Sequence, residues 1–231
     1  MDFSAFGTIT FDCYGTLIDW EAGILPVLRS VLAAHGQTLP DARILELYGE
    51  FEAQAESGAY QSYRNVLESV VQQLGERCGF RPTPAELRSL HESVPAWPSF
   101  PDTAAALQKL EQRYRLAVIS NIDDDLFAAT RKHLGVEFAA VITAQQARSY
   151  KPSLNNFRLA LQSLAVEPSH LLHAGQSVYH DVIPAQSLGI GTVWVNRRSA
   201  RPGAGAVRVA SGKPDLVVPD VATLAALSVT V

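Results

Sequence analysis

The sequence predicts an α/β fold, a doubly wound parallel sheet of the Rossmann type with a helical insertion, and three observations predict it. Short apolar runs rich in β-branched residues alternate with longer amphipathic segments, as in proteins with buried parallel sheets. About a hundred residues separate the first run from the second, far more than one crossover connection needs. Most of that interval has helical periodicity, which indicates a cap inserted into the core.

The core elements follow from this alternation. Five runs predict strands buried on both faces: Thr8–Phe11, Leu116–Ile119, Ala140–Thr143, Leu171–Ala174 and Thr192–Val195. Four amphipathic segments between the later runs predict helices: Thr103–Gln112, Asp124–Leu134, Leu154–Leu164 and Ile183–Leu188.

The insertion is predicted to be a helical cap domain over residues 19–95, so that the core domain comprises residues 1–18 and 96–231. Apolar stripes suited to bundle packing predict four helices in it: Glu21–Ala34, Ala42–Ala55, Tyr63–Cys78 and Pro84–Glu92. The prolines at the second boundary predict a hinge near Pro95, Pro98 and Pro101.

Composition limits the classes of function. Hydrophobic residues make up 47% and charged residues 18%, which predicts a folded core. The net charge of −4 provides no basic field for nucleic acid or an anionic membrane, so we expect a small-molecule substrate and neither of those partners. The two cysteines form no CxxC pair, and no secretory signal or spanning apolar run is evident, so a cytoplasmic protein is expected. A homodimer is possible.

Chemically capable residues follow the predicted strands. In open α/β sheets, ligands bind beyond the carboxyl ends of the strands. Four of the predicted strands, or the loops after them, are followed by such groups: Asp12; Ser120 and Asn121; Lys151; and Gln176, Ser177 and Asp181. Each group alone has a structural alternative, such as a helix cap or an exposed loop, so their joint occurrence carries the prediction.

The four groups lie in motifs that resemble those of the haloacid dehalogenase superfamily, in the same order over most of the chain. The motifs are Phe11-Asp12-Cys13-Tyr14-Gly15-Thr16-Leu17, Ile119-Ser120-Asn121, Tyr150-Lys151-Pro152 and His173-Ala174-Gly175-Gln176-Ser177 with Asp181. The resemblance implies a core of that superfamily, a nucleophilic Asp12 that forms a covalent ester, and a cap that closes over the substrate.

The resemblance also implies a role for each strand-end residue. Lys151 would pair with Asp12 and keep it ionised, because a neighbouring ammonium favours the carboxylate. Thr16 would orient that carboxylate. Ser120 and Asn121 would donate hydrogen bonds to a substrate oxygen or a departing anion.

Two substitutions favour the 2-haloacid dehalogenase branch. Tyr14 stands where phosphatases of the superfamily have an acidic Asp, and a phenol with a pKa of about 10 is a poor proton donor for a leaving group. Gln176 stands where those phosphatases have a carboxylate that helps to hold Mg²⁺. We therefore expect no metal and no cofactor, with Tyr14 and Gln176 near the substrate. Ser177 would orient the hydrolytic water, and Asp181 would act as its general base.

One departure leaves the substrate open. Well-defined 2-haloacid dehalogenases hold the halide with a cap arginine that has no clear counterpart here, and Arg64 is the best substitute that the sequence offers. The expected reaction is cleavage of the carbon–halogen bond of a short 2-haloacid, of the (S)-2-haloacid dehalogenase type. The alternatives are a Mg²⁺-dependent phosphatase, a hydrolase of another small carboxylate, and a non-catalytic protein that keeps the fold.

Overall fold

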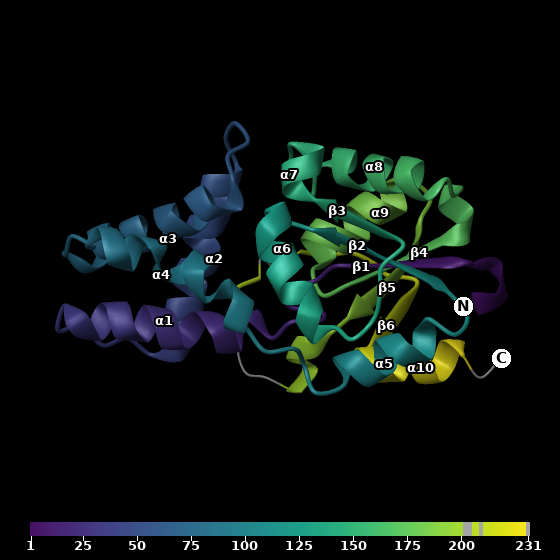
Figure 1. Ribbon diagram of the computed structural model, residues 1–231, viewed down its shortest axis with the longest axis horizontal. Helices are drawn as coiled ribbons and strands as arrows, with labels where there is room; N and C mark the ends of the chain where they lie inside the picture. Colours follow the sequence, from purple (N-terminus) through teal and green to yellow (C-terminus); the bar gives the residue numbers. More distant parts are fainter. Residues whose placement is uncertain (201–204, 208–209, 230–231) are drawn as a thin grey trace.

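The core is a six-stranded parallel sheet in the order β3-β2-β1-β4-β5-β6, shown in Figure 1. The computed structural model describes residues 1–200, 205–207 and 210–229. The strands are β1 (Thr8–Phe11), β2 (Arg115–Ser120), β3 (Ala140–Thr143), β4 (Leu171–Gly175), β5 (Gly191–Val195) and β6 (Leu216–Val218). The chain runs outward from β1 to β3 and then returns to β4, so the strand order reverses beside β1, where such sheets bind ligands.

The strand register brings the predicted motifs to one edge of the sheet. Phe11 at the end of β1 pairs with Val118 of β2 and with Ala174 of β4. Asp12, Ser120 and Gly175 therefore leave the sheet at nearly the same level, because parallel strands in register end together.

Helices cover both faces of the sheet, and successive β2 side chains face opposite layers. Val118 packs in the apolar cluster that includes α5 and α10, whereas Ala117 and Ile119 pack in the cluster that includes α8 and α9. Figure 1 shows α8 and α9 above the sheet and α5 and α10 below it. The core helices are α5 (Thr103–Leu110), α6 (Asp124–Thr130), α7 (Ala144–Ala147), α8 (Leu154–Leu164), α9 (Ile183–Ser187) and α10 (Val221–Ser228).

The five predicted strands are present with small changes at their ends, and several other features differ from the prediction. The helix expected over Asp124–Leu134 ends at Thr130 and continues as a 3₁₀ turn over Arg131–His133. The short helix α7, the short strand β6 and the helix α10 were not predicted. The β6 run has only three residues, too few for a periodic signal to show in the sequence.

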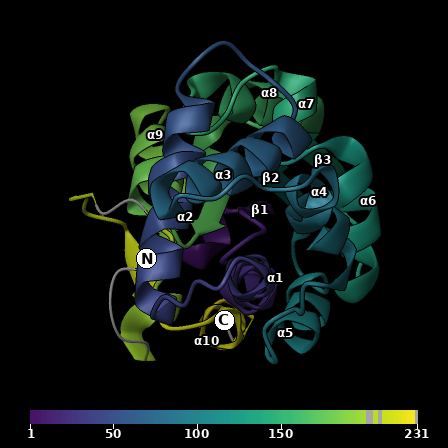
Figure 2. The ribbon, with the colours of Figure 1, turned by 90° about the vertical axis from the view of Figure 1, so that its left-hand side faces the viewer.

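Four helices beyond the carboxyl end of the sheet form the cap: α1 (Trp20–Ala34), α2 (Asp41–Glu56), α3 (Tyr63–Cys78) and α4 (Pro84–Ser93). Figure 2 views them from outside, with the end of β1 behind them. Side chains of Asp19 and Ser62 cap the first turns of α1 and α3, and Thr83 with Glu86 forms a capping box on α4. In the part of the chain described, no helix has both the length and the apolar character needed to cross a membrane.

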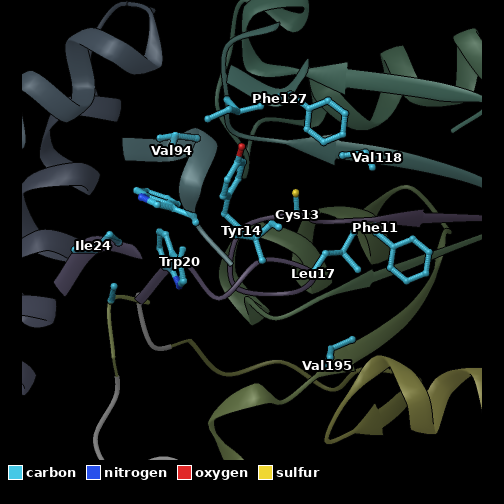
Figure 3. Close-up of a cluster of buried hydrophobic side chains, with 14 of the residues drawn as sticks. Phe11, Cys13, Tyr14, Leu17, Trp20, Ile24, Val94, Val118, Phe127 and Val195 are labelled. Carbon is cyan, nitrogen blue, oxygen red and sulfur yellow. The ribbon is translucent and has the colours of Figure 1, made fainter. Parts of the chain in front are cut away.

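Cap and core share buried apolar contacts. Figure 3 shows side chains from the sheet, such as Phe11 and Val118, in one cluster with Trp20 and Ile24 of α1. A second contact joins α2 to the segment after β5, where a Cβ on Gly49 would lie 2.6 Å from the carbonyl oxygen of Ala206. Any larger residue at position 49 would push this segment away from the cap.

Candidate active site

A small cavity lies where the cap meets the carboxyl end of the sheet. Its volume is about 50 Å³, room for roughly four water-sized groups. Eight of the ten predicted site residues line it: Asp12, Tyr14, Ser120, Asn121, Lys151, Gln176, Ser177 and Asp181. Thr16 lies directly behind Asp12. The arrangement suits a small, compact ligand.

Asp12 is held by two donors immediately after β1. Its Oδ1 accepts a hydrogen bond from Lys151 Nζ at 2.9 Å, and its Oδ2 accepts one from Thr16 Oγ1 at 2.6 Å. The Thr16 hydroxyl is fixed in turn, because it accepts the backbone N–H of Gln176 at 2.9 Å. Burial raises the pKa of Asp12, while the Lys151 ammonium and the Thr16 hydroxyl oppose that rise. The carboxylate is thus oriented and largely removed from water, which suits a nucleophile.

Lys151 is the charge partner of two carboxylates. Besides Asp12, its Nζ donates to Asp181 Oδ1 at 2.7 Å and to the carbonyl oxygen of Ile119 at 2.9 Å. Burial disfavours the ammonium, but the two carboxylates outweigh burial and raise the pKa of Lys151. All three donors are used within the protein, so Lys151 remains charged and fixed in place.

Asp181 is the most completely bonded carboxylate of the site. Its Oδ1 also contacts His173 Nε2 at 3.3 Å, and its Oδ2 accepts the backbone N–H of Ser177 at 3.1 Å. Burial would raise the pKa of Asp181, but Lys151 and His173 overcome it and lower the pKa. A carboxylate with a lowered pKa is a weaker base than a free aspartate. The role of Asp181 as general base stays a prediction, and its contact with Lys151 Nζ holds the lysine in position.

Tyr14 lines the cavity but is poorly placed to supply a proton. Its hydroxyl shares a 2.7 Å hydrogen bond with Thr130 Oγ1, and burial raises the pKa of Tyr14 well above 10. The next residue, Gly15, has φ +93°, and a Cβ there would lie 2.6 Å from the side chain of Gln176. Glycine is therefore required for the turn that brings the nucleophile loop against Gln176.

Ser120 and Asn121 differ in what they do at the end of β2. The Asn121 side chain forms two hydrogen bonds with the backbone of Lys151. Its Oδ1 accepts the N–H of Lys151 at 2.7 Å, and its Nδ2 donates to the carbonyl oxygen of Lys151 at 3.2 Å. Asn121 therefore positions the lysine. The Ser120 hydroxyl is buried and has no hydrogen-bond partner among the described residues, although it lines the cavity. A buried hydroxyl left unpaired is destabilising, so Ser120 is a candidate ligand contact.

The structure does not bring Arg64 to the cavity, so the expectation that it contacts the substrate is not met. The carboxylate of Asp123 accepts the backbone N–H groups of Tyr63 and Arg64, which fixes the start of α3 over the core. From there the Arg64 side chain pairs with Asp125 and contacts His91 Nδ1 at 3.2 Å. It does not line the cavity.

The cap contributes cavity-lining residues that were not among the predicted site residues, namely Trp20, Glu52, Glu56 and Tyr63. The core contributes three more that were not predicted: His180, Ala206 and Val207. Burial raises the pKa of Glu52 to about 7, against the opposing hydrogen bonds from Tyr63 and Tyr48. One sequence signal was available: Tyr48, Glu52 and Glu56 recur every fourth residue, which places acids beside the apolar stripe of α2.

The raised pKa of Glu52 predicts a pH-dependent effect on stability. The folded protein keeps a proton that the unfolded chain releases above about pH 4.5, so this group lowers stability as pH rises from 4.5 to 7, by about 3 kcal/mol in total. Because Glu52→Gln removes the titration, we expect the variant to gain stability relative to the parent by about that amount at pH 8 but not at pH 4.5. Urea unfolding at both pH values measures this. Glu50→Gln, an exposed change on the same helix, is the control, and an equal difference at both pH values would contradict the prediction.

In the described ranges, no group of three or more His, Cys, Asp or Glu residues is arranged to hold a metal ion. Lys151 Nζ forms ion pairs with both carboxylates of the motifs, Asp12 and Asp181.

The chain is similar to known haloacid dehalogenase-like hydrolases. A model of the haloacid dehalogenase-like hydrolase family matches residues 6–189. Two curated relatives are (S)-2-haloacid dehalogenase H-109 of Pseudomonas putida, 25% identical over 83% of this chain and 86% of the relative, and the (S)-2-haloacid dehalogenase of Xanthobacter autotrophicus, 24% identical over 83% and 75%.

A solved structure gives the same fold. The L-2-haloacid dehalogenase of Xanthobacter autotrophicus with chloropropionic acid covalently bound superposes with a TM-score of 0.79 at 22% identity, covering 96% of this chain and 98% of that one. At this identity the likeness concerns the fold.

Proposed function

The chain belongs to the haloacid dehalogenase-like hydrolases, and from this premise we propose that it cleaves the carbon–halogen bond of short 2-haloacids, as an (S)-2-haloacid dehalogenase does. One observation carries the choice of leaving group. The site pairs a buried carboxylate nucleophile with an ammonium, yet the hydroxyl of Tyr14 is bonded to Thr130 and its pKa is raised. A halide leaves carbon without a proton, whereas an alkoxide needs an acid.

The reaction has two steps. An Asp12 oxygen attacks the carbon that bears the halogen, an ester bond forms, and the halide leaves with the bonding electrons. Water then attacks the ester carbonyl of Asp12, and its oxygen stays on the regenerated carboxylate. One proton of the water goes to the departing alkoxide, which leaves as the 2-hydroxyacid, and the other is released to solvent. The Lys151 ammonium, 2.9 Å from Asp12 Oδ1, stabilises the negative charge that develops there in the second step.

The remaining residues position these groups. Thr16 fixes one oxygen of Asp12, and the unpaired Ser120 hydroxyl is available to the substrate carboxylate. Asp181 and Ser177 line the cavity near Lys151 and would hold the hydrolytic water. Two curated relatives at 24–25% identity are dehalogenases of this type, which supports the proposal.

The test is a halide-release screen over short 2-haloacids, such as 2-chloropropionate and bromoacetate, with and without EDTA. We expect one halide per 2-hydroxyacid formed and the same rate in chelator, because the charge at Asp12 is balanced by Lys151 rather than by a metal. Phosphate release from p-nitrophenyl phosphate that disappears in EDTA would instead favour the phosphatase. No turnover of either substrate, with Asp12→Asn indistinguishable from the parent, would favour a non-catalytic protein.

A further inference from the structure

Carboxyl groups line the cap side of the cavity, where the halide has to leave. Attack by Asp12 displaces the leaving group on the far side of the carbon, away from the sheet. That side is formed by α2 and α3, which Figure 2 shows in front of the end of β1. Among the described lining residues the cap contributes Glu52 and Glu56, and Lys151 is the one lysine or arginine. Arg201 and Arg208 lie outside the described residues.

Glu52 has a defined orientation. The hydroxyls of Tyr63 and Tyr48 both donate to its Oε1, at 2.6 and 2.9 Å. The two tyrosine hydroxyls also lie 3.0 Å apart, so the three side chains lock one another. The residue is 8% exposed, and its Oε2 has no hydrogen-bond partner in the described structure although Glu52 lines the cavity. Oε2 is therefore the atom of Glu52 left for a ligand.

A second buried group of the same cavity also lacks a partner. The hydroxyl of Ser120 is fully buried and unpaired among the described residues, and it comes from the core rather than from the cap. Two unpaired polar groups, from α2 and from β2, thus face one small cavity. Buried polar groups are normally paired, so the Ser120 hydroxyl indicates a polar ligand in this cavity, which Glu52 also lines.

The surroundings of Glu52 favour its neutral form. The titratable groups that face it are Glu56 and Tyr48 on α2, Tyr63 on α3, Tyr150 and Lys151 before α8, and Asp12 after β1. His180 and Asp181 line the same cavity. Burial is the main cause of the raised pKa of Glu52, and the negative charge of Asp12 adds to it, while the tyrosine hydroxyls oppose it.

We propose that Glu52, as a neutral carboxylic acid, donates a hydrogen bond from Oε2 to the departing halide and so determines which leaving groups the site accepts. This inference rests on the proposed dehalogenation. As the Asp12–carbon bond forms and the carbon–halogen bond breaks, the halide takes the bonding electrons. The proton stays on Glu52 throughout and only solvates the developing charge, so no further reactant is needed.

The test that does not depend on turnover is bromide binding, followed by bromide NMR line broadening from pH 6 to 9 at constant ionic strength. In the parent protein we expect affinity to fall about tenfold for each pH unit above 7, because Glu52 loses its donor there. Glu52→Gln keeps an N–H donor that does not titrate, so its affinity should stay constant over this range. Glu52→Leu should bind bromide poorly at every pH.

Two controls identify the titrating group. Glu50→Gln, exposed on the same helix, should leave the parent profile unchanged. Glu56→Gln should leave the break in place, because the charge of Glu52 raises the pKa of Glu56, whereas burial and the charge of Asp12 raise the pKa of Glu52. A parent profile that is flat with pH, or one that Glu52→Gln leaves unaltered, would overturn the proposal.

A kinetic experiment distinguishes failure of this inference from failure of the proposed function. With 2-bromopropionate, kcat/KM of the parent should decline above pH 7, and Glu52→Gln should remove that decline. Dehalogenation without this change would leave the function standing and reject the role of Glu52. Absence of dehalogenation together with pH-dependent bromide binding would reject the proposed function but keep the role of Glu52 as a hydrogen-bond donor to an anion.

Discussion

Replacing Asp12 by Asn is expected to reduce kcat for 2-haloacid turnover by about 10⁴-fold or more, because the amide is a far weaker nucleophile at the same position. The substitution conserves shape, and Thr16 and Lys151 retain their other partners, so we expect the fold to survive. The measurement is halide release under saturating substrate, with folding checked by circular dichroism. Asp125→Asn, an exposed carboxylate on α6, is the matched control and should keep parental activity.

The same residue can be examined without mutation. Under single-turnover conditions in heavy-oxygen water, the ester mechanism leaves one labelled oxygen on Asp12, which mass spectrometry of the peptide detects. Label found only in the product, with the enzyme active, would show that water attacks carbon directly and that Asp12 is not the nucleophile.

Replacing Lys151 by Ala is expected to impair both activity and stability. The side chain is 2% exposed and separates Asp12 from Asp181, so its loss leaves two buried carboxylates without a counter-charge. Breaking a buried ion pair destabilises a protein by roughly 3–5 kcal/mol. We therefore expect a loss of that size at pH 7 in urea unfolding, together with a fall in kcat of about 10³-fold or more.

The pH dependence of that loss distinguishes electrostatics from packing. At low pH the two carboxylates of the variant take up protons and the repulsion between them disappears, so the difference from the parent should shrink as pH falls. Lys132→Ala, at an exposed position, is the control and should have little effect. A loss of stability that is the same at every pH would mean that Lys151 acts through packing alone.

The sequence predicted the core side of the site well, and the reason is geometric. Parallel strands end at a common edge, so Asp12, Ser120 and Lys151 could be placed together from their positions after successive strands. The register between β1 and its neighbours fulfils that expectation. The roles of these residues were harder to predict than their positions. The Asn121 side chain binds the backbone of Lys151, and the contacts of Asp181 lower its pKa.

The cap side could not be predicted in the same way. Helical periodicity shows which face of α2 is apolar, but it does not show which part of the core that face packs against. Arg64 illustrates the difference: it was expected at the substrate, yet the hydrogen bonds of Asp123 to the start of α3 place its side chain against Asp125 instead.

By itself, the sequence determined five of the six strands, the insertion of a helical cap, and the strand-end residues that form one polar edge, because these depend on local periodicity and on the geometry of parallel sheets. The tertiary structure alone decided that Glu52 faces the cavity, that the Ser120 hydroxyl has no hydrogen-bond partner among the described residues, and that Arg64 pairs with Asp125 away from the cavity. These features depend on how the cap helices pack against the core, through contacts such as that of Gly49 with Ala206 between residues far apart in the chain.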